Sequence, residues 1–169
     1  NINHMSEAEL KELVESGKYV PSYMWNQNGW LCSKMKLHVT SQTQRCYPTT
    51  HSEDLFSETL NATIKAGDPT GMRAVVTTET EEGITFVTEC VGKVFAPDEF
   101  DRNDWTLVGE PETTISVNRP ATVEMTCATL VNRIPQLIDA PAGYVTTDQY
   151  PYNEYCVHAL NTYVKSRNL

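Results

Sequence analysis

The stretch from Asn118 to Tyr144 constrains the fold most, because it carries the clearest helical pattern in the chain. Pro120 suits the first turn of a helix, where its missing N–H needs no partner. Apolar side chains then recur at helical spacing and predict one apolar face, formed by Val123, Cys127, Leu130, Val131 and Ile134. Pro135 should kink or end the helix near Arg133 or Ile134. A helix with one apolar stripe needs a partner layer, so we expect the preceding chain to supply a sheet.

A second line of the same helix carries polar side chains. Glu124, Ala128 and Asn132 follow at four-residue spacing, so a carboxylate and an amide lie two turns apart. Such a line is suited to contact a ligand. Glu124 is therefore a candidate catalytic acid or base, and Asn132 and the adjacent Arg133 are candidates for substrate binding.

Length and charge exclude several classes of partner. The 169 residues fit one domain, and 40% apolar with 21% charged residues is typical of an ordinary globular protein. A formal net charge of −9 without any Lys/Arg run argues against nucleic acid or an anionic membrane as a partner. No apolar run approaches the roughly 18 residues of a membrane span, and no signal pattern is present, so we expect a cytoplasmic protein. Five widely spaced cysteines without a Cys-x-x-Cys pair indicate reduced thiols.

Aromatic and amide side chains crowd together just before a short helix that is predicted to follow Gly29. Flat apolar walls combined with amide donors and acceptors are typical of a small-molecule pocket. The alternative is that the tryptophans anchor the core and the amides cap a turn. The candidate substrate-binding residues of this stretch are Tyr23, Trp25, Asn26, Asn28 and Trp30.

Alternating and β-branched runs predict the strands. The expected strands are His38–Tyr47 before Pro48, a hairpin of Met72–Thr80 and Ile84–Phe95 joined by Glu81-Glu82-Gly83, and two short strands at Trp105–Val108 and Thr113–Val117. We expect an α+β fold, with an open, mostly antiparallel sheet of about four to six strands covered on one face by helices. The strands carry apolar side chains on both sides. This predicts a homo-oligomer, either a dimer or a tetramer, that buries the other face.

His51 is a second candidate acid or base, because it lies close to Glu53 and Asp54. No second His lies at ligand spacing, so no metal site is predicted, and a solvated loop is the alternative interpretation. The sequence also lacks a nucleophile elbow, a phosphate-binding loop and a glycine-rich dinucleotide turn. We therefore expect this chain alone to bind no dinucleotide cofactor.

The two ends complete the expected single domain of residues 1–169. Asn1–Met5 is either a cloning remnant or native sequence that leads into a helix at Glu7–Ser16, which begins with a capping box. Residues 153–169 are expected to form a helical tail, because apolar side chains recur at helical spacing from Asn153 to Arg167. No repeat or linker divides the chain.

Four segments resemble the C-terminal domain of the dihydrodipicolinate-reductase-like amine dehydrogenases, the group that includes 2,4-diaminopentanoate dehydrogenase. They are Ser6–Lys18, Gly29–Leu37, Ile64–Arg73, and Val131–Pro135 with Ala140–Thr147. The last is the most specific, since it combines the proline-containing helix with the turn that follows. The resemblance covers most of residues 5–151. It implies that a Rossmann domain outside this chain binds NAD(P)H, while this domain holds the substrate and builds the oligomer.

One segment departs from that family. Between Gly17 and Gly29 the family typically has a His- and Glu-containing segment, whereas this chain has aromatic and amide residues, which predict an apolar pocket. Three functions therefore stay open. The first is the substrate-binding and oligomerisation domain of an NAD(P)H-dependent amine or imine oxidoreductase. The second is a stand-alone isomerase, cyclase or lyase that uses Glu124 or His51, and the third is a non-catalytic ligand-binding module.

Overall fold

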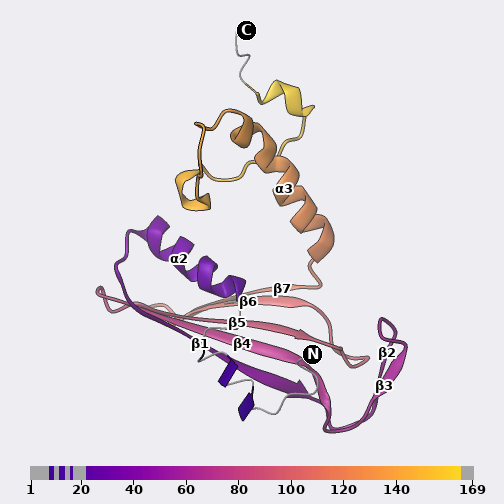
Figure 1. Cartoon of the computed structure of the whole chain (residues 1–169). Coiled ribbons are helices and arrows are strands. Elements are labelled where there is room, and N and C mark those ends of the chain that lie inside the picture. Colours follow the sequence, from indigo (N-terminus) through magenta and orange to yellow (C-terminus); the bar gives the residue numbers. More distant parts are fainter. Residues whose placement is uncertain (1–7, 10–11, 14–15, 17–21, 165–169) are drawn as a thin grey trace. The chain divides into compact units, whose positions relative to one another are not determined.

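The computed structural model describes residues 8, 9, 12, 13, 16 and 22–164 (Figure 1). Asn1–Met5 and most of the helix predicted at Glu7–Ser16 lie outside these residues. The contacts of the chain form two compact units, Asn1–Pro97 and Asp98–Leu169, and the single domain of residues 1–169 stays a prediction. Within the described part of the chain, no helix combines the length and apolar character that a membrane span requires.

The first unit is built on a three-stranded antiparallel sheet. Its order is β1 (Val39–Thr50), β4 (Pro69–Thr80) and β5 (Thr85–Lys93). The predicted hairpin between β4 and β5 is confirmed, and Gly83 supplies the positive φ of 78° that its turn needs. β1 continues through Pro48, past its predicted end. The proline is tolerated because β1 is an edge strand, which pairs with β4 on one side only.

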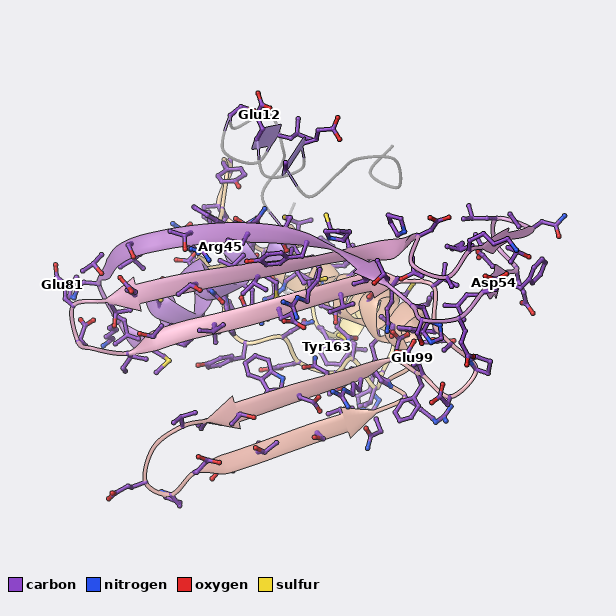
Figure 2. The ribbon with its side chains drawn as sticks, turned by 90° about the horizontal axis from the view of Figure 1, so that it is seen from below. Glu12, Arg45, Asp54, Glu81, Glu99 and Tyr163 are labelled. Atoms are coloured by element: carbon purple, nitrogen blue, oxygen red, sulfur yellow. The ribbon has the colours of Figure 1, made fainter. Side chains whose placement is uncertain are left out.

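A small hairpin follows residues 51–54, the solvated loop that one interpretation of the sequence predicts after β1. It consists of β2 (Leu55–Ser57) and β3 (Ala62–Ile64). Asp54, labelled in Figure 2, closes its base by accepting hydrogen bonds from Lys65 Nζ at 2.7 Å and Ala66 N at 2.9 Å. These bonds hold the pKa of the Asp54 carboxyl below its ordinary value, and the bond from Lys65 contributes most.

Helix α2 (Tyr23–Met35) lies along one face of the three-stranded sheet and contacts all three strands (Figure 1). The predicted start after Gly29 is wrong. The helix begins at Tyr23 because the Ser22 hydroxyl accepts a hydrogen bond from Met24 N and caps it. It ends where Lys36 adopts a left-handed conformation with φ 60°. The expectation that a helix covers one sheet face is confirmed for α2.

Amide side chains hold α2 on the sheet. Asn28 Nδ2 donates to Thr78 Oγ1 at 3.1 Å, and both residues are fully buried. Two further bonds join the helix to β1, since Gln42 Nε2 donates to Trp25 O at 2.9 Å and Ser22 N donates to Gln44 Oε1 at 2.6 Å. The buried apolar side chains around them are small: Cys32, Cys46, Ala74 and Val76. Directional hydrogen bonds therefore fix the position of α2, more than the bulk of an apolar core does.

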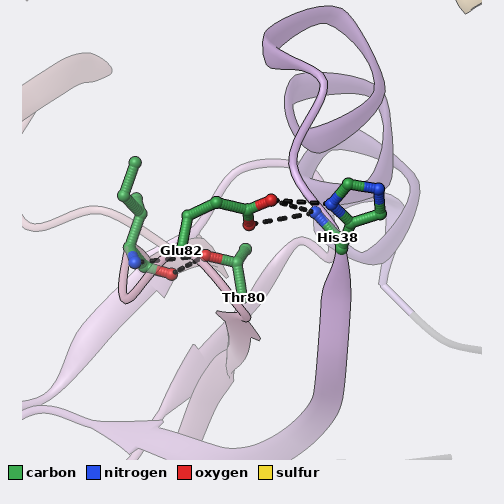
Figure 3. Close-up of polar contacts among 4 residues, drawn as sticks. His38, Thr80 and Glu82 are labelled. Atoms are coloured by element: carbon green, nitrogen blue, oxygen red, sulfur yellow. Dashed lines mark hydrogen bonds and ion pairs between the residues drawn. The ribbon is translucent and has the colours of Figure 1, made fainter.

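A further contact joins the end of α2 to the turn between β4 and β5 (Figure 3). His38 Nδ1 lies 2.7 Å from Glu82 Oε1, and His38 N donates to both carboxylate oxygens at 3.1 and 3.2 Å. Beside it, Thr80 Oγ1 donates to Ile84 O at 2.8 Å and closes the turn. The bond to Glu82 raises the pKa of His38, and the same bond lowers the pKa of Glu82.

This pair predicts a pH-dependent contribution to stability. The His38 contribution is complete below its ordinary pKa of 6.5 and is lost as pH rises through the raised value. The contribution of Glu82 is complete at pH values above its ordinary pKa of 4.5, and it is lost as the pH falls through the lowered pKa of the folded state. We expect His38→Gln to lower the free energy of unfolding at about pH 5.5 and to change it little at about pH 9. Glu82→Gln should give the same profile in urea titrations, and a His38→Gln effect that is equal at both pH values would contradict the assignment.

The second unit contains a two-stranded antiparallel sheet and one long helix. β6 (Arg102–Leu107) pairs with β7 (Thr113–Asn118), which confirms the two predicted short strands as a pair. Helix α3 spans Thr122–Ile138, and Pro135 lies inside it, so the proline does not end the helix. Two 3₁₀ turns follow, η2 (Thr147–Gln149) and η3 (Leu160–Thr162). The predicted helical tail is wrong where the structure describes it, because residues 153–159 form no α-helix.

The predicted apolar face of α3 is largely exposed. Val123 and Leu130 are 72% and 69% exposed, and Ile134 is 37% exposed. Pro135 is the buried residue of the helix. Within the second unit this face is therefore largely uncovered.

Candidate functional site

A cavity of about 670 Å³ lies in the second unit, beside the C-terminal half of α3. This volume is in the range of pockets that hold small organic molecules, about 300–1,000 Å³. Its walls come from the helix and from the chain that follows it. The polar and aromatic lining residues are Asn132, Gln136, Asp139, Gln149, Tyr150, Glu154 and Tyr163, and the Cys156 thiol lines it too.

The turn after α3 creates the second wall. Asp139 caps the helix, and Ala140 N donates to Leu137 O at 3.3 Å. Gly143 then adopts φ 129°, a conformation that favours glycine, and η2 follows. Residues 151–156 return along the helix as a result.

Hydrogen bonds attach residues 151–156 to α3, and we call four of them, all made by nitrogen donors, the clasp. Each joins a side chain to a backbone atom. The bonds are Arg133 Nη1 to Pro151 O at 2.8 Å, Gln136 Nε2 to Tyr152 O at 3.0 Å, Asn153 Nδ2 to Thr129 O at 3.1 Å, and Cys156 N to Asn132 Oδ1 at 3.1 Å. A weaker bond runs beside them from Cys156 Sγ to Asn132 O at 3.9 Å. The clasp therefore builds one wall of the cavity from polar contacts.

The structure gives Asn132 and Arg133 defined places at this site. Asn132 lines the cavity, while its Oδ1 accepts the clasp bond from Cys156 N. The Arg133 guanidinium contacts Gln136 Oε1 and lies 5.4 Å from the centre of the Tyr150 ring, besides its bond to Pro151 O. Arg133 is not among the lining residues. Its charge is thus engaged in holding the wall, and its predicted binding role is untested.

The two candidate acid/base residues do not line this cavity. Glu124 lies in the first turn of α3, two turns before Asn132, and is exposed. His51 belongs to the first unit, where its Nδ1 accepts a hydrogen bond from Glu53 N at 3.1 Å. Their catalytic roles remain predictions.

The aromatic and amide candidates of the first unit lie on α2, and not in a loop before it. Successive helical residues point about 100° apart, so these side chains are distributed around the helix. Asn28 faces the sheet and is buried, whereas Tyr23 is 62% exposed and Asn26 is exposed. Trp25 and Trp30 are half-buried, and Trp30 Nε1 is buried without a partner among the described residues. The predicted substrate-binding role of these five residues remains a prediction.

Three titratable groups on or beside α2, two cysteine thiols and one tyrosine hydroxyl, stay protonated at neutral pH. Burial raises the pKa of the Cys32 thiol and of the Cys46 thiol, so both stay protonated. Burial of its hydroxyl end, together with Cys90, raises the pKa of Tyr23 to about 12. Among the described residues, no group of three or more His, Cys, Asp or Glu side chains is placed to hold a metal ion.

Sequence reasoning found Asn132 but missed the carboxylates Asp139 and Glu154 of the cavity. Glu154 falls in the stretch that the sequence predicts as a helix, and a helix there gives no reason to expect Glu154 beside α3. The Pro141-Ala142-Gly143 turn was the available signal, because a chain that reverses after a helix is placed to run back along it.

Comparison with known proteins relates the chain to one kind of enzyme. No family model and no curated protein matches the sequence. The structure is similar to that of an amine dehydrogenase from Mycobacterium smegmatis, with a TM-score of 0.78 and 36% sequence identity, over 89% of this chain. The chain spans 45% of the length of that structure, so the similarity concerns one part of it. This confirms the resemblance that the four sequence segments indicate, and the α+β fold with open antiparallel sheets.

Proposed function

We propose that this chain is the substrate-binding and oligomer-forming part of an NAD(P)H-dependent amine or imine oxidoreductase. The 36% identity with an amine dehydrogenase over 89% of the chain carries the proposal. The chain lacks a glycine-rich dinucleotide turn, so its residues do not fit the cofactor, and residues outside this sequence would bind NAD(P)H. When bound there, the cofactor would supply or accept a hydride at the carbon that bears the nitrogen of a small amine or imine.

Within this chain, the cavity beside α3 is the proposed substrate site. Its apolar surface, which includes Pro135, Pro141 and Val145, would exclude water from the carbon skeleton of a guest. The amide of Gln136 and the carboxylates of Asp139 and Glu154 would orient its polar end. The contribution of this chain would thus be binding and positioning.

The test uses the complete gene product that contains this sequence. We expect it to bind NADPH or NADH, and to oxidise the reduced cofactor when a small ketone is supplied with ammonia. The ketone without ammonia is the control for simple carbonyl reduction. A complete gene product that binds neither cofactor in calorimetry would overturn the proposal.

We also propose that the sheet face opposite α2 contacts a second copy of this chain. Strand alternation places Val75, Val87 and Val91 on this face, and Val87 is 66% exposed. The same face carries both charge signs, Arg45 and Arg73 beside Glu79 and Glu89 (Figure 2, where Arg45 is labelled). A two-fold axis brings a surface against itself, so opposite charges on one face can pair across it.

Val87→Lys should weaken the oligomer, because it replaces an exposed apolar side chain of this face with a positive charge. We expect the dissociation constant in sedimentation velocity to rise about tenfold or more, equivalent to about 1.4 kcal/mol. Val108→Lys is the control, because Val108 is also an exposed valine but lies between β6 and β7. A wild-type chain that sediments as a monomer, or equal effects of both variants, would contradict this interface.

A further inference from the structure

We infer that residues 150–156, which we call the strap, separate from α3 as a unit while the helix stays folded, and that the Arg133 side chain is the latch that keeps the strap closed. The strap lines one side of the cavity, with Tyr150, Pro151, Glu154 and Cys156. Its release therefore opens that side and gives a guest a way in or out. The inference goes beyond the proposed function, because it holds for any guest of the cavity.

The strap is irregular chain that buries little surface. Residues 151–156 form neither helix nor strand, whereas α3 has the repeating backbone bonds of a 17-residue helix. Every residue from 150 to 156 is half-buried or exposed, and Tyr152 and Tyr155 are 73% and 82% exposed. Segments that bury few apolar groups open at a lower free energy than regular elements do. The strap should therefore open before α3 unfolds.

The clasp that closes the strap is itself largely exposed to water. The bonds to Pro151 O and Tyr152 O and the bond from Asn153 Nδ2 are exposed, and the bond from Cys156 N is partly buried. Water can replace the protein partner in an exposed hydrogen bond, so such a bond adds only modestly to the free energy of closure. Closure thus depends on several modest contacts that act together.

The chain is held on both sides of the strap. Before it, η2 is followed by a hydrogen bond from Tyr150 N to Thr147 O at 3.3 Å. After it, His158 N donates to Tyr163 Oη at 3.1 Å, and η3 contacts α3. Opening is therefore confined to the residues between these two points.

Arg133 acts on three consecutive residues of the strap. Its guanidinium donates to Pro151 O at 2.8 Å and lies 5.4 Å from the centre of the Tyr150 ring. It also contacts Gln136 Oε1, which leaves Nε2 of the same amide to donate to Tyr152 O at 3.0 Å. Hydrogen bonds from a charged donor are stronger than those between neutral groups. One side chain therefore governs much of the closure, which makes Arg133 the latch.

The Cys156 thiol reports the opening, because it lines the cavity and is half-buried while the strap is closed. The test labels the complete gene product that contains this sequence with fluorescein maleimide, a bulky reagent, and follows the Cys156 peptide by mass spectrometry. Arg133→Met removes the guanidinium and keeps a good helix former at this position. We expect it to raise the rate of Cys156 labelling about tenfold. Labelling of Cys90, which is half-buried in the first unit, should not change.

Arg119→Met is the matched control. Arg119 belongs to the same unit and also lies over an aromatic ring, 4.3 Å from the centre of Phe100, but it makes none of the clasp bonds. This variant should label at Cys156 as the wild type does. An unchanged rate in Arg133→Met, or an equal rise in both variants, would overturn the assignment of Arg133 as the latch.

Hydrogen exchange separates opening of the strap from unfolding of the whole unit. In Arg133→Met we expect the Cys156 amide, which donates to Asn132 Oδ1, to exchange about tenfold faster. The amides in the middle of α3 should keep their wild-type exchange rates. If the α3 amides speed up by the same factor as the Cys156 amide, the helix and the strap open together and the inference is wrong.

Discussion

Gly71→Ala should destabilise the chain by about 3 kcal/mol, the upper part of the range for overpacked sites. A methyl group at this position of β4 would lie 2.1 Å from Gly92 O and 2.5 Å from Lys93 Cα. Both are backbone atoms of the neighbouring strand β5, which cannot rotate aside as a side chain could. The two strands would have to move apart at this point of the ladder. Urea unfolding followed by tryptophan fluorescence measures the loss.

Gly92→Ala is the matched control, because Gly92 lies on β5 opposite Met72, the residue after Gly71. A Cβ at Gly92 would meet no atom within 4 Å. Its substitution should change the free energy of unfolding by no more than about 0.5 kcal/mol. Equal losses in the two variants would show that the loss of glycine flexibility, and not the close approach of the strands, causes the effect.

Thr78→Val should cost about 2 kcal/mol, although it changes the volume of the side chain little. The Asn28 amide is fully buried and donates to Thr78 Oγ1, and Asn28 Oδ1 has no partner among the described residues. Removing the hydroxyl would leave the whole amide buried without a partner. An unpaired buried polar group loses its hydration and gains nothing in exchange.

A double variant separates this effect from a loss of packing. Asn28→Leu removes the buried amide, so adding Thr78→Val to it should cost much less than Thr78→Val costs alone. The coupling between the two substitutions in a double-mutant cycle of urea unfolding should be at least about 1 kcal/mol. Strictly additive losses would show that the Asn28–Thr78 hydrogen bond does not hold α2 on the sheet.

Features governed by neighbouring residues could be predicted from the sequence. The β4–β5 hairpin followed from β-branched alternation on both sides of Glu81-Glu82-Gly83. β6 and β7 lie where two short strands were predicted, although β6 begins three residues before Trp105 and the pairing itself was not predicted. In each case a short connection joins the two strands, so each strand is the nearest available partner of the other. The strand pattern along the sequence therefore matches the pairing in the structure.

The errors arose where distant contacts decide the structure. The start of α2 was placed too late because aromatic and amide residues favour helices weakly, whereas the Ser22 cap and the buried Asn28–Thr78 bond stabilise the helix from Tyr23 onward. The helical spacing after Asn153 was overruled by the clasp, since Cys156 N donates to Asn132 instead of to a carbonyl four residues earlier. The candidate site depends on the same contacts. Its carboxylates therefore could not be grouped from their spacing along the chain.

The clasp has a consequence for how this site can diversify. In three of its four bonds, the returning segment contributes a backbone atom, at Pro151, Tyr152 and Cys156. Attachment therefore depends on the segment's own side chains at Asn153 and, through its thiol, at Cys156, and elsewhere on its backbone. Mutation can remodel the inner lining of the cavity residue by residue while its scaffold stays in place. Substitutions in the side chains at Pro151 and Tyr152 should therefore leave the clasp in place.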